Sequence, residues 1–195
     1  MVDGKGGASF DKVMFPVWSP DSSKISYVAQ QKGDFIIVND NKKSQPFAAI
    51  SDLQYNADGS SLAAIVKKDG KDYVWIDGKL QASADQIDQF VWSAHGSHYA
   101  YAARDNASWR VFHDGSAGKA VVGVQLLTIS PDGKHVAYIG SIGSGYIVQP
   151  GVMNQAQISA KTQLLLVDER TLDSESGATY TFTGIVFSPD SQQLA

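Results

Sequence analysis

The stretch that decides the fold is Ile-Ser-Pro-Asp-Gly-Lys-His-Val-Ala-Tyr, residues 129–138. Its first two residues form an anchor, an apolar residue followed by Ser or Asn, which recurs at constant spacing. The four copies are Trp18-Ser19, Tyr55-Asn56, Trp92-Ser93 and Ile129-Ser130, so each step is 37 residues. A fifth copy, Phe187-Ser188, follows after 58 residues, so one unit carries an insertion. Self-similarity at this period predicts an array of stacked or radial units, none of which buries its apolar face alone.

Four short segments recur within each unit and predict four β-strands. The first ends at the anchor, and in the turn that follows Pro131 presets φ while Asp132 and Gly133 supply the turn hydrogen bond and a positive φ. The second alternates apolar and small residues, as in residues 136–138. The third ends on an aspartate at a constant offset: Asp40, Asp77, Asp114 and Asp168. The fourth is expected to carry an apolar residue five positions before the next anchor: Val13, Ile50, Ile87, Val124 and Phe182.

This pattern predicts an all-β chain. Period-two alternation, β-branched and aromatic residues and a turn every 8 to 12 residues indicate antiparallel strands. Four-stranded units of this length, repeated, are typical of β-propeller blades. A β-sandwich has no reason to keep three identical steps, because its strands occupy inequivalent places. The predicted fold is therefore a β-propeller of four-stranded antiparallel blades.

The turn motif resembles a known repeat. Ser-Pro-Asp followed by an apolar residue and Tyr, at residues 19–27 and 130–138, is similar to the WD40-like repeat of TolB-type propellers, and Ser188-Pro189-Asp190 repeats its start. The copy at Asn56 lacks the proline, and the copy at Ser93 lacks both proline and aspartate. The resemblance implies the propeller fold. It leaves function open, because such repeats serve binding proteins, peptidase gating domains and some lyases.

The repeat also predicts where blades begin. We expect whole blades at about 14–50, 51–87, 88–124 and 125–182, with partial blades at 1–13 and 183–195. In one reading the two partial blades complete each other and close a five-bladed ring, leaving no free edges. In the other, which we favour, the chain is an excerpt of a larger propeller.

Composition narrows the class of partner. The net charge is −4 and no basic cluster exceeds a pair of lysines, which argues against nucleic acid. No apolar run approaches the roughly 20 residues that span a bilayer. The chain has no cysteine, so thiol catalysis and disulfides are excluded, and a periplasmic or extracellular location is expected.

The residues that usually carry chemistry keep to the repeat and predict structural roles. His98 and His135 are one repeat apart, in a position occupied elsewhere by Lys24, Ser61 and Gln193, which indicates an exposed place beside a turn. His95 and His98 have the His-x-x-His spacing of some metal sites, but they are expected on a hairpin and not on a helix, with no third ligand nearby in the sequence. The glycine-rich residues 140–145 precede no expected helix, so a phosphate loop is improbable. The turn and third-strand aspartates are expected to accept backbone hydrogen bonds. We therefore expect no catalytic residue, no metal site and no cofactor.

The insertion that interrupts the repeat in the fourth unit says more about function than the repeated residues do. The connection between the second and third strands of the fourth unit has gained 17 residues, approximately 141–162, and contains Tyr146. On the same expected face, the blade-to-blade loops carry Asp52, Asp88, Gln89 and Gln125. Long loops on a rigid scaffold often carry function, so these five residues form the predicted partner-binding surface.

Three functions are compatible with the sequence. The leading hypothesis is a non-enzymatic TolB-like propeller that binds a protein or peptide. The alternative is the gating propeller of a larger serine peptidase of the prolyl-oligopeptidase type, with an α/β-hydrolase domain elsewhere in the polypeptide. A metal-dependent sugar lyase is a third possibility, which requires histidines clustered at the channel.

Overall fold

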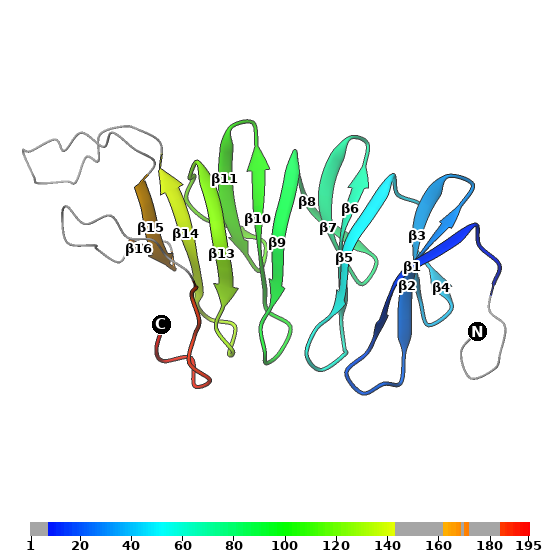
Figure 1. Cartoon of the computed structure of the whole chain (residues 1–195), viewed down its shortest axis with the longest axis horizontal. Helices are drawn as coiled ribbons and strands as arrows, with labels where there is room; N and C mark the ends of the chain where they lie inside the picture. The colour runs from blue at the N-terminus through cyan, green and yellow to red at the C-terminus, as the bar shows by residue number, and fades with distance from the viewer. Residues whose placement is uncertain (1–7, 143–161, 169, 172–183) are drawn as a thin grey trace, which may run out of the picture. The chain divides into compact units, whose positions relative to one another are not determined.

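The structure, a computed structural model, describes residues 8–142, 162–168, 170–171 and 184–195. Within them the chain forms strands and turns and no helix (Figure 1). The strands make four antiparallel four-stranded sheets, in the orders β1-β2-β3-β4, β5-β6-β7-β8, β9-β10-β11-β12 and β13-β14-β15-β16. Their bounds are β1 (Lys12–Trp18), β2 (Ile25–Gln31), β3 (Asp34–Asn39), β4 (Lys42–Lys43), β5 (Ala49–Tyr55), β6 (Leu62–Lys68), β7 (Lys71–Ile76), β8 (Lys79–Ala84), β9 (Gln86–Trp92), β10 (Tyr99–Asp105), β11 (Ser108–His113), β12 (Ser116–Ala117), β13 (Gly123–Ile129), β14 (Val136–Ile142), β15 (Thr162–Val167) and β16 (Arg170–Thr171).

The anchors occupy one structural position. Each is the last residue of the first strand of its sheet: Trp18 in β1, Tyr55 in β5, Trp92 in β9 and Ile129 in β13. Because equal sequence spacing corresponds to the same place in each sheet, the prediction of four-stranded blades is confirmed.

Tight turns join the third and fourth strands where the sequence places an aspartate. Asp77-Gly78 connects β7 to β8 and Asp114-Gly115 connects β11 to β12, with φ values of 47° and 92°, and 48° and 81°. Two consecutive positive φ angles define the type I′ turn, whose twist matches that of antiparallel strands. The Asp-Gly pairs therefore form the predicted hairpins.

The expected fourth strands are wrong in position. Ile50, Ile87 and Val124 lie in the first strands β5, β9 and β13, and Val13 lies in β1. The true fourth strands include two-residue segments such as β4 and β12, and isolated bridges continue the pairing from Phe35 to Phe47 and from Trp109 to Val121. Short irregular edge strands leave little periodic signal, and the apolar residues in question belong to the regular strand that follows. Each sheet begins two residues before the expected blade start, and Phe182 lies outside the described residues.

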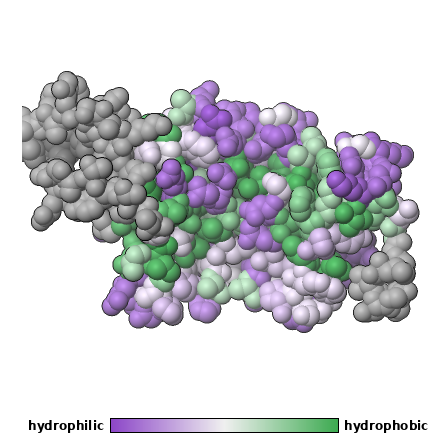
Figure 2. Space-filling model, viewed as in Figure 1, coloured by the Kyte–Doolittle hydropathy of each residue, from purple (hydrophilic) through white to green (hydrophobic). Residues whose placement is uncertain are grey.

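The chain divides into two compact units, each with its own apolar core. The first contains residues 1–87 and 95–97, and the second contains 88–94 and 98–195. In the first unit, Val28 and Ile37 of one blade pack with Ile50 and Leu53 of the next. In the second unit, the equivalent cluster joins β10 and β11 to β13, β14 and β15. Figure 2 shows hydrophilic surface gathered on the hairpin ends and hydrophobic surface along the strands.

The aromatic residues of the repeat differ in burial. Tyr101 and Tyr138 are buried, whereas Trp18 is 53% exposed. In the first unit, β5 packs against β2 and β3 of the preceding blade. The described residues contain no such neighbour for β1, on which Trp18 stands.

Candidate functional site

The first strand of each of the four described sheets is interrupted at the same point. Phe15, Asp52, Gln89 and Leu126 stand 37 residues apart and have positive φ values of 51°, 52°, 52° and 51°. The strand register shifts around three of them, between Met14 and Val17, Ser51 and Gln54, and Gln125 and Thr128. A shift in register with one residue in the left-handed region is a β-bulge, which redirects side chains. None of the four is glycine, so each bulge holds strained backbone.

These bulges carry the polar residues that the sequence assigned to loops. Asp52 and Gln89 are the positive-φ residues themselves, while Asp88 and Gln125 directly precede the equivalent positions. The expectation of a blade-to-blade loop is therefore corrected, because these four residues belong to β5, β9 and β13. Tyr146 and most of the insertion lie outside the described residues.

The Gln89 side chain holds the bulge of the next blade. Its Nε2 donates to the carbonyl oxygen of Val124 at 3.1 Å, and its Oε1 accepts a hydrogen bond from the amide of Leu127 at 3.1 Å. Those two backbone groups flank the irregular residues of β13, where ladder pairing with β14 is interrupted. Gln89 and Gln125 are thus brought together within the second unit, and Gln89 has a structural role.

The remaining polar residues of the bulges present their side chains to solvent. Asp52, Asp88 and Gln125 are exposed. Asp52 Oδ1 accepts a hydrogen bond from Gln54 Nε2 at 2.9 Å, and Asp88 Oδ1 accepts one from the amide of Gln89 at 2.9 Å. Asp52 belongs to the first unit and the others to the second. Each unit therefore offers one carboxylate on an irregular first strand.

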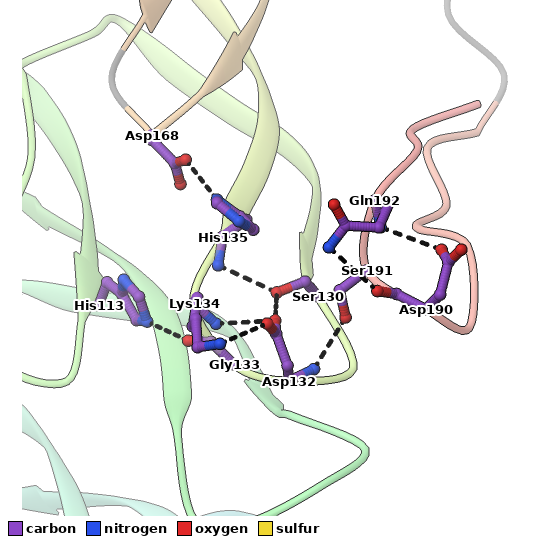
Figure 3. Close-up of polar contacts among 10 residues, drawn as sticks. All are labelled: His113, Ser130, Asp132, Gly133, Lys134, His135, Asp168, Asp190, Ser191 and Gln192. Atoms are coloured by element: carbon purple, nitrogen blue, oxygen red, sulfur yellow. Dashed lines mark hydrogen bonds and ion pairs between the residues drawn. The ribbon is translucent and has the colours of Figure 1, made fainter.

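The turn aspartates fulfil their predicted structural role (Figure 3). Ser130 Oγ donates to Asp132 Oδ1 at 2.7 Å and accepts a hydrogen bond from the amide of His135 at 3.0 Å. The same arrangement recurs with Asp21 and Asp190, each of which accepts from the serine two positions earlier. The hydrogen bond from Ser19 and those from Ser23 lower the pKa of Asp21 to about 2. The hydroxyl of Ser130 likewise lowers the pKa of Asp132.

The third-strand aspartates fix the start of the second strand. Asp77, Asp114 and Asp168 each accept a backbone hydrogen bond through Oδ1, at 2.9 to 3.0 Å. In the last two blades the second carboxylate oxygen contacts the histidine of the repeat position. Nδ1 of His98 lies 2.6 Å from Asp114, and Nδ1 of His135 lies 2.7 Å from Asp168.

Sequence reasoning missed one association. His113 Nε2 lies 3.7 Å from Asp114 Oδ2, so two histidines and an aspartate gather at the end of β11. The His95-x-x-His98 spacing did not reveal this group, because its members meet through the pairing of β10 with β11. The signal available in the sequence was His113 itself, which stands where the second and fourth sheets have the apolar residues Ile76 and Val167.

Comparisons with known proteins show the fold. No protein-family model matches the sequence, and no curated protein matches it. Among solved structures, the chain is similar to the tricorn protease, at 14% identity and a TM-score of 0.51, covering 97% of this chain and 20% of that one. It is also similar to TolB from Acinetobacter baumannii (17%, TM-score 0.46, covering 94% and 48%) and to the β-propeller domain of the Trilobed protease from Pyrococcus furiosus (16%, TM-score 0.46, covering 82% and 55%).

The similarity to the tricorn protease concerns the fold alone, and the four antiparallel four-stranded sheets are those expected of propeller blades. The chain spans between 20% and 55% of the length of these three structures. Among the residues that the structure describes, no helix has the length and apolar character needed to cross a bilayer.

Proposed function

We propose that this β-propeller chain is a non-enzymatic scaffold, acting in the periplasm or outside the cell, that binds a protein or peptide at its first-strand bulges. In the second unit the proposed contact residues are Asp88, Gln89 and Gln125, and in the first unit the bulge at Asp52 offers the equivalent contact; Tyr146, also predicted to bind, lies outside the described residues. The observation that carries the proposal is the bulge itself, repeated at non-glycine residues with positive φ. Strained backbone of this kind persists where the surrounding structure holds it, and it is often found at binding sites.

The chemistry of the bulges favours a basic partner. The exposed carboxylates of Asp52 and Asp88 stand on first strands, and Gln125 adds an exposed amide. Charge complementarity of this kind raises association rates and selects partners of opposite charge. A peptide bearing Lys or Arg therefore fits these bulges better than an acidic one.

The polar contacts of the turns support a scaffold rather than a hydrolase. The Ser130 hydroxyl is held by Asp132 and by the backbone of His135, while the His135 ring contacts Asp168 instead (Figure 3). A Ser-His-Asp triad needs the histidine ring within hydrogen-bond reach of the serine hydroxyl, and here that hydroxyl donates to Asp132 instead. Ser130 is therefore paired with Asp132, and His135 with Asp168, in two separate contacts.

The test is selection of peptides on the purified chain. A random peptide library is panned on the immobilised protein, and recovered peptides are labelled and titrated by fluorescence anisotropy. Basic peptides should be recovered, and Asp88→Asn combined with Gln125→Ala should weaken their binding at least tenfold. Asp69→Asn, at an exposed residue of the β6–β7 turn, is the matched control and should leave affinity unchanged. Equal affinity in both variants would refute the proposal.

A second candidate is the propeller part of a larger peptidase. What favours it is the similarity to the tricorn protease, of which this chain covers only 20%. In that case the bulges would line a passage for unfolded substrate, and catalysis would belong to another domain. Sequencing the coding region beyond codon 195 decides between the candidates, because an α/β-hydrolase domain with a Gly-x-Ser-x-Gly elbow is required.

A further inference from the structure

Three potential metal ligands meet at the end of β11. His98 precedes β10, His113 ends β11, and Asp114 begins the turn to β12. The pairing of Ala100 with His113 places these segments side by side. One ligand atom from each residue lies within 4.8 Å of the others, with Asp114 Oδ2 at 2.6 Å from His98 Nδ1 and 3.7 Å from His113 Nε2. All three side chains are partly exposed, so an ion can reach them from solvent.

The surrounding residues hold this group in place. Asp114 Oδ1 accepts a hydrogen bond from the amide of Tyr99 at 3.0 Å, which orients the carboxylate. His113 Nε2 lies 2.8 Å from the carbonyl oxygen of Gly133 (Figure 3). The absence of a side chain at Gly133 makes room for the His98 ring, because a Cβ there would lie 2.4 Å from Cβ of His98. The backbone of Gly133 thus contacts both histidines: its carbonyl oxygen contacts His113, and its missing side chain leaves room for His98.

The next blade provides an internal comparison. His135 and Asp168 repeat the His98–Asp114 pair at 2.7 Å, and Asp168 likewise accepts a backbone hydrogen bond from Val136. The pairing of Ala137 with Val167 matches that of Ala100 with His113. The third blade therefore has a histidine where the fourth has Val167. The His–Asp pair alone is part of the repeat, and His113 is the addition that turns it into a set of three ligands.

We propose that His98 Nδ1, His113 Nε2 and the Asp114 carboxylate bind a zinc ion, with the fourth position open to water or to a ligand. Two imidazoles and one carboxylate are a donor set that zinc accepts in tetrahedral geometry. Zinc–ligand bonds near 2.0–2.1 Å place neighbouring ligand atoms about 3.3 Å apart in a tetrahedron. The distances of 2.6 and 3.7 Å lie on either side of this value, and His98 Nδ1 lies within 4.8 Å of His113 Nε2, so zinc binding requires the side chains to rotate toward a common centre.

Binding replaces two hydrogen bonds of the metal-free chain. The ion takes the place of the hydrogen between His98 and Asp114, and His113 Nε2 exchanges the Gly133 carbonyl for the metal. The backbone hydrogen bond from Tyr99 to Asp114 remains and orients the ligand, as outer contacts do in metal sites.

The first test measures stoichiometry and affinity. The chain is stripped with a chelator and titrated with zinc chloride by calorimetry, and cobalt chloride is used to record the visible spectrum of a tetrahedral site. We expect one ion per chain and a tetrahedral cobalt spectrum. His113→Ala should weaken zinc binding at least tenfold, whereas the matched variants His135→Ala and His95→Ala should bind as the original chain does. Circular dichroism without zinc verifies that each variant is folded.

The second test builds the site in the next blade. Val167→His supplies the missing third ligand beside His135 and Asp168, so this variant should bind a second zinc ion. Zinc binding that is absent, that survives His113→Ala, or that falls equally in His135→Ala would overturn the proposal. So would a folded Val167→His chain that still binds a single ion.

Discussion

At the residue scale, the turn aspartates make the free energy of unfolding depend on pH in the acid range. The hydrogen bonds from Ser19 and Ser23 lower the pKa of Asp21 to about 2, from an ordinary value of 3.8. Serine hydroxyls likewise lower the pKa values of Asp132 and Asp190. A carboxylate whose pKa is lower in the folded state stabilises the fold above its unfolded pKa and loses that contribution as the pH falls through the folded pKa.

We therefore expect the urea midpoint of the chain to fall as the pH decreases from about 4 to about 2. Asp21→Asn removes one titrating group, so its midpoint should depend less steeply on pH across this window. The measurement is urea unfolding by circular dichroism at several pH values. An unchanged slope would show that Asp21 does not contribute.

Glycine substitutions separate backbone strain from steric contact. Gly78 has φ of 92° with open space around it, whereas Gly133 has φ of 75° and the His98 side chain directly beside it. Gly78→Ala should cost about 1–2 kcal/mol, from the left-handed conformation alone. Gly133→Ala should cost about 1–3 kcal/mol more, because the His98 side chain must move. Denaturant unfolding of the two variants gives the difference, and equal losses would contradict the close contact.

At the scale of elements, the irregular first strands depend on contacts between blades. Gln89 satisfies the backbone groups of Val124 and Leu127. Gln89→Ala removes both hydrogen bonds and should destabilise the second unit by about 1–3 kcal/mol. Gln89→Glu retains only the acceptor and places a negative charge beside the Val124 carbonyl, so it should also destabilise. Hydrogen exchange at the Leu127 amide provides a local readout, and unchanged protection would refute this role of Gln89.

The sequence predicted the regular elements and missed the irregular ones, for physical reasons. The anchors, the Asp-Gly turns and the alternating second strands leave periodic signals that survive into the structure. The bulges leave none, because left-handed backbone at Asp52 and Gln89 is imposed by tertiary structure and not by glycine. The predicted positions of the fourth strands are wrong because segments such as β4 and β12 contain only two residues and leave no periodic pattern. His98 and His113 come together through the pairing of β10 with β11, and the spacing of the two histidines in the sequence does not reveal that pairing.

At the scale of the whole molecule, stability depends on apolar contacts between neighbouring blades. Phe47 is 2% exposed and joins the cluster formed by β2, β3, β5, β6 and β7. Phe47→Ala should therefore cost about 3–5 kcal/mol, the range for deleting a buried aromatic side chain. Phe15 is 58% exposed, so Phe15→Ala is the matched control and should change stability by less than about 0.5 kcal/mol. Urea unfolding measures both, and similar losses would contradict the packing described.

The bulges have a further consequence for solubility. β1, β5, β9 and β13 stand at one edge of their sheets, and a straight edge strand is a template on which other chains polymerise. The residue in the left-handed region turns its amide and carbonyl away from the line of the strand, so an incoming strand finds no continuous ladder. Deleting Asp52 straightens β5 and should produce aggregation that light scattering detects. The bulges that present polar side chains therefore also protect the edge strands β1, β5, β9 and β13 from pairing with other chains.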